Sequence, residues 1–245
     1  MKLQKIAGLG MLMSAAIGIL GVSSAQAQLT VTGTGIAAGD GENVAASATF
    51  NNVGGHLVLT LINTYTGSTF GNADTLTGVF FNGASGLTIA NEQYAAGDVV
   101  YNFPTLPGTT ISSPTTITPT ENWAFTTIGG QSGIDGLQGG PANGIISAGF
   151  NPVPLHDGFT NGSHNPYVQD ELIFTFTTAL SLSSISDVNF LFGTQADTTD
   201  TIPGGGNSTP VPEASTVMAG ALMLLPLGVG AIRALRKERA AVRIS

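Results

Sequence analysis

The chain has 245 residues and a formal net charge of −8, with 42% hydrophobic residues, 9% charged residues and no cysteine. Its seven Lys and Arg residues all lie near the two ends. Of its fifteen acids only Glu213 and Glu238 lie outside residues 28–212, which therefore carry thirteen acids and no base. A body without cations cannot neutralise phosphate groups, which excludes nucleic-acid binding and phosphoryl transfer by Lys or Arg clamps. Without cysteine the chain has no disulfide and no thiolate metal site. About 180 residues between the ends are enough for one hydrophobic core.

Residues 1–27 have the three parts of a secretory signal peptide. The positive start, the apolar stretch and the small-x-small cleavage site lie at Lys2 and Lys5, at residues 6–22, and at Ala25 and Ala27. We expect signal peptidase to cut after Ala27, so that Gln28 begins the mature protein. An uncleaved membrane anchor is the alternative, and the glycines within the apolar stretch argue against it.

Alternation of apolar and polar residues with a period of two runs through the body, residues 28–200, and predicts β-strands. It is strongest in three segments, each with three apolar side chains on one face: Leu57, Leu59 and Leu61 in 56–62; Leu172, Phe174 and Phe176 in 171–177; Val188, Phe190 and Phe192 in 186–192. Weaker alternation predicts further strands at 29–34, 46–51, 75–82, 98–103, 122–127 and 144–148. About nine short strands, divided by Gly, Asn, Asp and Pro, favour an all-β fold, namely an antiparallel, jelly-roll-like β-sandwich.

Turn and loop signals separate these strands. Three Asp-Gly pairs, Asp40-Gly41, Asp135-Gly136 and Asp157-Gly158, are predicted turns because both residue types tolerate positive φ. Residues 109–120 hold eight Ser and Thr and two prolines, which favours an exposed, extended polar loop; the same loop carrying O-linked sugar is the alternative. Residues 201–210 are rich in Gly, Pro and Ser, the composition of a flexible linker.

Residues 211–245 form a tail of three parts. A short motif is followed by sixteen residues without a charge, 217–232, and then by a basic segment, 233–243. The motif is Val211, Pro212, Glu213, Ala214, Ser215 and Thr216, and the first four basic residues are Arg233, Arg236, Lys237 and Arg239. The uncharged stretch is at the short limit for a transmembrane helix. Because basic flanks stay in the cytoplasm, the body would lie outside the inner membrane, in agreement with the signal peptide.

This tail resembles the PEP-CTERM sorting signal, with Ala214 in place of the second proline. The resemblance implies that an exosortase cuts near the motif and that the protein passes from the inner membrane to the cell surface or extracellular matrix. A plain C-terminal anchor is the alternative. The body also resembles exosortase-dependent surface proteins of environmental Gram-negative bacteria, a group with no assigned catalysis. The segments that carry this resemblance are 74–81, 122–125, 144–149 and 185–194.

Candidate metal ligands are few. His156 and Asp157 with His164 could supply two imidazoles and a carboxylate, but the spacing matches no standard site and a Pro-, Gly- and Asn-rich surface loop is the better interpretation. Calcium is the one ion that the composition invites, through residues 40–43 or 197–200. Neither segment matches a known calcium motif, so we expect no cofactor and keep calcium open.

Candidate catalytic groups are also weak. The body has no Gly-x-Ser-x-Gly motif, and Asp170 and Glu171 would point to opposite faces of a strand rather than act as a pair. Trp123 and Phe125 share one face of an alternating segment, which favours the core over a sugar platform. We therefore expect an exported surface or matrix protein without catalysis, associated with exopolysaccharide. A carbohydrate-binding adhesin and a secreted glycosidase are the alternatives.

The excess of acids also makes a prediction about stability. Carboxylates that mostly repel one another have folded-state pKa values above their unfolded values, so stability should increase as the pH falls through those values. Added salt or divalent cations should relieve the same repulsion.

Overall fold

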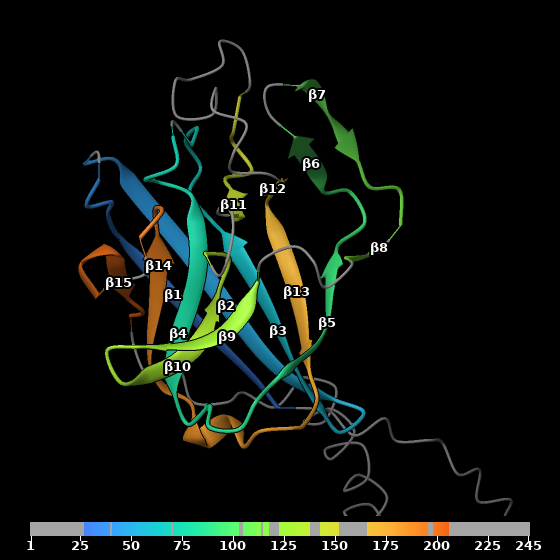
Figure 1. Cartoon of the computed structure of the whole chain (residues 1–245), viewed down its shortest axis with the longest axis vertical. Coiled ribbons are helices and arrows are strands. Elements are labelled where there is room, and N and C mark those ends of the chain that lie inside the picture. Colours follow the sequence, from blue (N-terminus) through green and yellow to red (C-terminus); the bar gives the residue numbers. More distant parts are fainter. Residues whose placement is uncertain are drawn as a thin grey trace, which may run out of the picture. The chain divides into compact units, whose positions relative to one another are not determined.

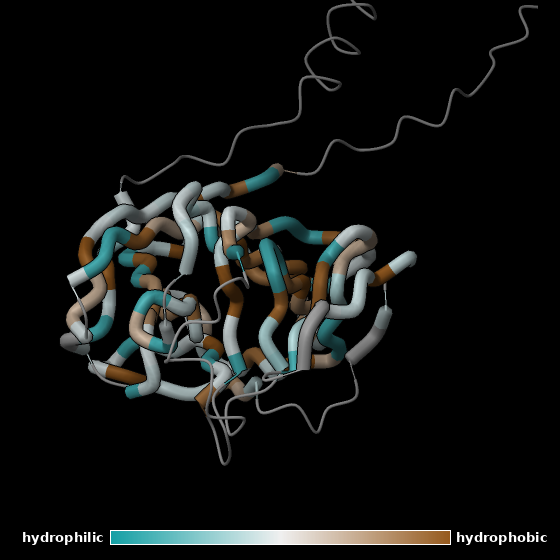
Figure 2. Tube along the Cα trace, turned by 90° about the horizontal axis from the view of Figure 1, so that it is seen from above, coloured by the Kyte–Doolittle hydropathy of each residue, from teal (hydrophilic) through white to brown (hydrophobic). Residues whose placement is uncertain are grey.

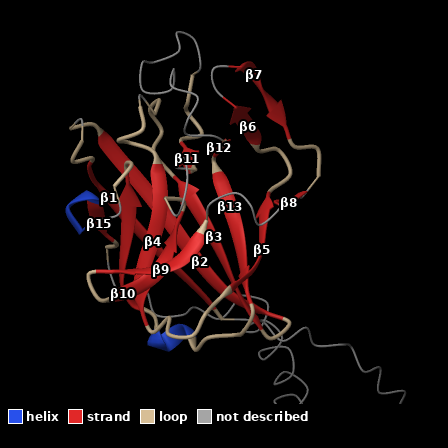
Figure 3. Ribbon diagram, in the orientation of Figure 1, coloured by secondary structure: helices blue, strands red, loops and turns tan. Residues whose placement is uncertain are grey.

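The computed structural model describes residues 27–39, 41–69, 71–102, 105–113, 115–117, 123–137, 143–151, 166–195 and 198–205. These residues form an all-β fold of two sheets, which confirms the predicted fold class (Figure 1). The only helical turns in this part of the chain are two short 3-10 turns, η2 (Leu182–Ser184) and η3 (Thr198–Asp200), shown in blue in Figure 3. No helix within the described ranges is both long and apolar enough to span a bilayer.

The first sheet has six strands, all paired antiparallel. In spatial order they are β1 (Gln28–Ile36), β2 (Asn43–Val53), β3 (His56–Asn63), β13 (Glu171–Phe176), β5 (Ile89–Tyr94) and β8 (Thr115–Ile117). The hairpin between β2 and β3 is closed by Gly54 and Gly55, with φ of 60° and 85°. A two-residue turn with both φ values positive matches the twist of the strands, and glycine adopts it without strain.

The second sheet has nine strands. Its main path is β15 (Thr201–Pro203), β14 (Ser186–Phe192), β4 (Leu76–Asn82), β11 (Gly144–Ile146), β12 (Tyr167–Gln169), β6 (Val99–Asn102) and β7 (Thr105–Thr110). Beside this path β10 (Gln131–Asp135) pairs with β4, and β9 (Ala124–Ile128) pairs with β10. The pair β11–β12 is parallel, so the prediction of purely antiparallel pairing is wrong there. The connection from β11 to β12 is longer than the dozen or so residues that a parallel pair requires.

The core lies between the two sheets. All nine apolar residues of the three strongest predicted segments are buried, as the alternation predicts. Phe50 of the first sheet and Phe81 of the second meet edge to face with ring centroids 4.9 Å apart. Figure 2, seen from above, shows hydrophobic segments gathered in the middle of the molecule, with others at its margin. Each such phenylalanine contributes about 1.5–3 kcal/mol by leaving water.

Strand β15 corrects the predicted linker. Residues 201–205 are ordered parts of the fold: Ile202 is buried in the core and the Gly205 N–H donates to the Thr32 carbonyl at 2.6 Å. Strand β1 packs this closely because Gly33 has no side chain: a Cβ there would lie 2.7 Å from the ring of Phe190. A composition rich in Gly, Pro and Ser is typical of a linker, but it does not record the packing of Ile202 that orders this segment. Residues 206–210 lie outside the described ranges.

Two of the other loop predictions also change. Asp135-Gly136 lacks the positive φ on which its predicted turn rests: Asp135 is the fully buried last residue of β10, and its Oδ1 accepts from the Leu137 N–H. Within 109–120, residues 109–110 end β7 and residues 115–117 form β8, so these parts pair in the sheets instead of forming a free loop, and Ser112 and Ser113 form a bend between them. Gly41 has φ of 79°, in keeping with a turn. Asp40 and the pair Asp157-Gly158 lie outside the described residues.

A second, smaller cluster contains Tyr101, Ile146, Phe150 and Tyr167. Tyr167 is buried, and its hydroxyl donates to Asn72 Oδ1. Replacing it by Tyr167→Phe should lower the free energy of unfolding by about 1–2 kcal/mol, because Asn72 loses a buried donor. Urea denaturation measures this. Tyr101→Phe is the matched control: its hydroxyl makes a longer bond of 3.3 Å to Gln169, so the loss should be smaller. A larger loss for Tyr101→Phe would contradict the assignment.

Candidate functional site

Most residues of the predicted processing sites lie outside the described part of the chain. This holds for Ala25, for residues 211–216 and for Arg233, Arg236, Lys237 and Arg239, as well as for the predicted membrane helix. Gln28, the predicted first residue of the mature protein, is described and is the first residue of β1. The candidate metal ligands His156, Asp157 and His164 lie outside the description, as do Asp40 and Asp197.

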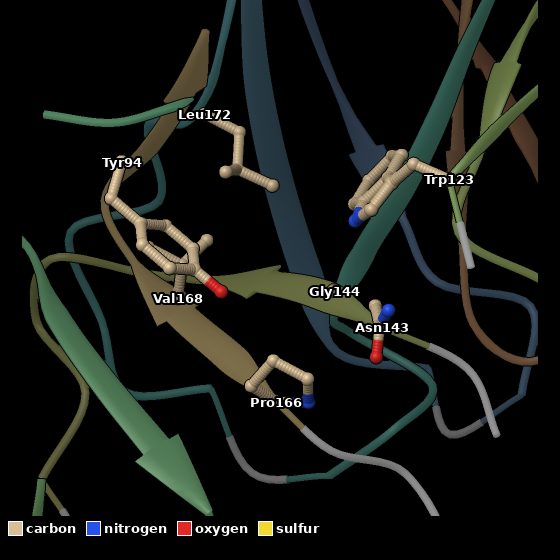
Figure 4. A pocket seen from close by; sticks show the side chains of 7 residues that line it. All are labelled: Tyr94, Trp123, Asn143, Gly144, Pro166, Val168 and Leu172. Carbon is tan, nitrogen blue, oxygen red and sulfur yellow. The ribbon is translucent and has the colours of Figure 1, made fainter. Parts of the chain in front are cut away.

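A small, partly open cavity lies between the two sheets (Figure 4). Its volume is about 10 Å³ and its walls come from both sheets and their connections: Tyr94, Trp123, Asn143, Gly144, Pro166, Val168 and Leu172. In Figure 4 the hydroxyl of Tyr94 and the indole nitrogen of Trp123 turn toward the space between them, with the amide of Asn143 to one side. Aliphatic side chains and two aromatic rings thus surround a small number of polar atoms.

Trp123 forms one wall of this cavity and is fixed by core packing. It is 8% exposed, and its ring lies 5.1 Å from that of Phe174 of β13. The backbone beside it is glycine by necessity, because a Cβ on Gly136 would lie 3.0 Å from Trp123 Cε2 and 2.5 Å from the Asn143 carbonyl oxygen. The prediction that Trp123 belongs to the core rather than to a surface sugar platform is confirmed.

Asn143 is the unusual residue of this cavity. Its backbone N–H donates to the Gly136 carbonyl at 2.9 Å, which holds it in place before β11. The residue is 2% exposed, and neither Nδ2 nor Oδ1 has a hydrogen-bond partner within the described structure. A buried polar group left in this way destabilises a fold by about 1–3 kcal/mol. Sequence reasoning did not single out Asn143, since asparagine before a strand is ordinary.

A second candidate site is an acidic groove of about 410 Å³, defined by Asp98, Asp170 and Glu171. The chain passes from β12 in the second sheet to β13 in the first at Asp170, whose φ of 87° is rare for a residue other than glycine. This crossing brings Asp170 and Glu171 near the turn that precedes β6, where Asp98 Oδ2 accepts from the Ala95 N–H at 2.5 Å. Asp170 is therefore not part of a strand, and the predicted alternation of faces does not apply to it.

Burial is the main cause of the altered acidity in this groove. It raises the pKa of Asp98 to about 6, an effect that the Ala95 hydrogen bond opposes and the negative charges of Glu171 and Asp170 reinforce. Burial, together with the charge of Asp170, also raises the pKa of Glu171. Raised pKa values of this kind occur in both catalytic and purely structural acids.

Metal binding finds no support among these acids. No three His, Asp or Glu side chains within the described ranges are arranged to hold a metal ion. Buried Asp74 and Asp135 instead accept hydrogen bonds from the N–H groups of Gly71 and Leu137. From the candidate calcium segments, Glu42 and Asp200 are described, and Asp200 borders a separate open groove of about 480 Å³ with Asn72 and Gln195.

Comparison of the chain with protein-family models, with curated proteins and with solved structures finds no match.

Proposed function

We propose that this chain is an exported protein, processed at both ends, whose β-rich body acts at the cell surface or in the extracellular matrix without catalysis. One observation supports the proposal: both predicted cuts fall outside the strands that the structure describes. Strand β1 starts at Gln28, which pairs with Asn51, and the last described pairing joins Thr32 to Gly205. A cut after Ala27 and another near Pro212 would therefore remove no described strand.

The chemistry of the body supports the same role. Its surface has no Lys or Arg, because residues 28–212 contain none, and an acidic, compact domain stays soluble after release. Exopolysaccharide is the partner that we propose in the matrix, and signal peptidase and exosortase are the proposed processing enzymes. The inner membrane would hold the chain through residues 217–232 only until the second cut.

The arrangement of strands favours a jelly-roll-like sandwich. Strand β3 pairs with β13 in the first sheet, and β4, which follows β3, pairs with β14, which follows β13, in the second. An antiparallel ribbon that passes in this way from one sheet to the other is the element from which jelly rolls are built. This fold is common among surface and binding domains, which is an association by fold only.

Processing predicts a specific pair of new ends. In a host with an exosortase, the intact mass and terminal sequences of the surface-released protein should give Gln28 at the start and loss of everything beyond the region of Pro212. Replacement of the motif by Pro212→Ala with Glu213→Ala should leave the tail attached and the protein in the inner membrane. Ser208→Ala, three residues before the motif, is the matched control and should be processed normally. A surface form that still contains Arg233–Ser245 would contradict the sorting signal and would leave a simple anchor.

A secreted glycosidase is the second candidate, and the acidic groove is the observation that favours it. Hydrolysis of a glycosidic bond uses one protonated and one ionised carboxyl group, and the pKa of Asp98, raised to about 6, suits the acid. The test is turnover of a polysaccharide by the parent protein and by the variants Asp98→Asn and Glu171→Gln. Loss of turnover in both variants, with melting as cooperative as that of the parent protein, would establish catalysis and replace the non-catalytic role.

A further inference from the structure

The amide of Asn143 points to a ligand. We propose that the cavity between Tyr94, Trp123 and Asn143 is a binding site for a single hydroxyl oxygen, held by the Asn143 side chain. The residue is 98% buried, as its 2% exposure implies, and lines a cavity whose other named walls are mainly apolar. The proposal does not depend on export or processing, because it rests only on the described interior.

The chemistry of an amide selects the ligand. The Asn143 side chain offers two N–H donors and one carbonyl acceptor, and both of its polar atoms need partners. A hydroxyl group both donates and accepts, so one oxygen can serve Nδ2 and Oδ1 together. An anion would satisfy only Nδ2, within a body that carries thirteen acids and no base. A calcium or magnesium ion favours carboxylate oxygens, and no Asp or Glu is among the residues that line this cavity.

The size of the cavity sets the stoichiometry. Its volume of about 10 Å³ is close to the minimum that one water-sized oxygen occupies. The aromatic rings of Tyr94 and Trp123, the side chain of Leu172 and the ring of Pro166 leave no room for a whole sugar ring (Figure 4). A sugar could therefore enter only with one hydroxyl while its ring stayed outside. The oxygen comes either from water or from such a hydroxyl, and the chemistry at Asn143 is the same in both cases.

The ring of Trp123 provides the spectroscopic probe. It is the one tryptophan of the chain, so tryptophan emission, excited selectively over the tyrosines, reports on the surroundings of this ring. We expect the purified protein to show a nuclear Overhauser contact between the Asn143 side-chain amide protons and a long-lived water. Neutral oligosaccharides, with cello-oligosaccharides and malto-oligosaccharides as the probes, are then titrated while the fluorescence and the water contact are followed.

The outcomes separate the two sources of the oxygen. A water contact that persists through the titration, with no change of fluorescence, assigns the site to water. A saturable shift of Trp123 emission with loss of the water contact assigns it to a sugar hydroxyl, and Asn143→Leu should then weaken binding by about tenfold or more. Asn91→Leu, at a half-buried asparagine of β5, is the matched control and should leave binding unchanged. Absence of both the water contact and any sugar response in the parent protein would overturn the proposal, since that result requires no variant to fold.

Discussion

Gly133→Ala is expected to destabilise the protein more than any other change considered, by about 3 kcal/mol or more. Strand β10 lies so close to β4 that a Cβ on Gly133 would be 2.0 Å from the Val79 carbonyl oxygen and 2.6 Å from Phe80 Cα. Both neighbours are backbone atoms of a central strand, so neither can move without breaking pairs with β14. Overpacking usually destabilises a core by about 1–3 kcal/mol, and more where the neighbours cannot yield. Urea denaturation monitored by Trp123 fluorescence measures the loss.

Gly205→Ala is the matched control. Its nearest neighbour would be the Thr32 carbonyl oxygen at 3.6 Å, an ordinary contact, and its φ is not positive. The replacement should be neutral or should stabilise the protein by about 0.4–1 kcal/mol, because alanine restricts the unfolded chain more than glycine does. Equal stability of the two variants would mean that β10 does not pack on β4 at this distance.

The strands that the sequence predicts best are those that have one face in the core. In β3, β13 and β14 the alternation is imposed by burial, so Leu57, Phe174 and Phe190 can be recognised without a structure. Each of these strands has six to eight residues, which is long enough for the period to show. Their partners, and hence the sheet order, depend on contacts between distant segments that no local pattern records.

The strands that were not predicted are shorter or carry weaker patterns. Residues Tyr167–Gln169 and Thr201–Pro203 form three-residue strands, too short for a period of two to be read. Strand β10 could have been found from the pair Gly129-Gly130, whose φ values of 58° and 85° form the same hairpin turn as that between β2 and β3. Gly-Gly pairs favour two-residue hairpins as Asp-Gly pairs do, so they are an equal turn signal in this chain.

Neither candidate site follows from local sequence. Asp98 meets Asp170 and Glu171 only because the chain crosses between sheets at Asp170, and an aspartate with φ of 87° is not predicted from its neighbours. Asn143 becomes exceptional only through its complete burial. The predicted sorting residues differ in kind, because they are read by enzymes as a sequence and do not depend on the fold.

Stability is expected to increase as the pH falls from 7 toward 4, owing chiefly to Asp98. Its folded-state pKa is about 6 against an ordinary value of 3.8, so the folded state binds the proton more tightly than the unfolded state does. The contribution to stability is complete below about 3.8 and is lost as the pH rises through about 6. The groove is open to solvent although the Asp98 side chain is 6% exposed, so screening reduces the effect to roughly 1–2 kcal/mol. Thermal melts between pH 4 and 7 measure it.

Asp98→Asn isolates this contribution. The asparagine oxygen can still accept from the Ala95 N–H, which Asp98 Oδ2 now does, while the buried charge is removed. The variant should be more stable than the parent protein at pH 7, should match it near pH 4, and should vary less over that range. Added NaCl should narrow the difference at pH 7, because it screens the repulsion from Glu171 and Asp170. If the stability of Asp98→Asn varied with pH as that of the parent protein does, the titrating group would be another of the thirteen acids. In that case the stability of the body would follow from its total charge, as the sequence alone suggested, and not from the crossing at Asp170.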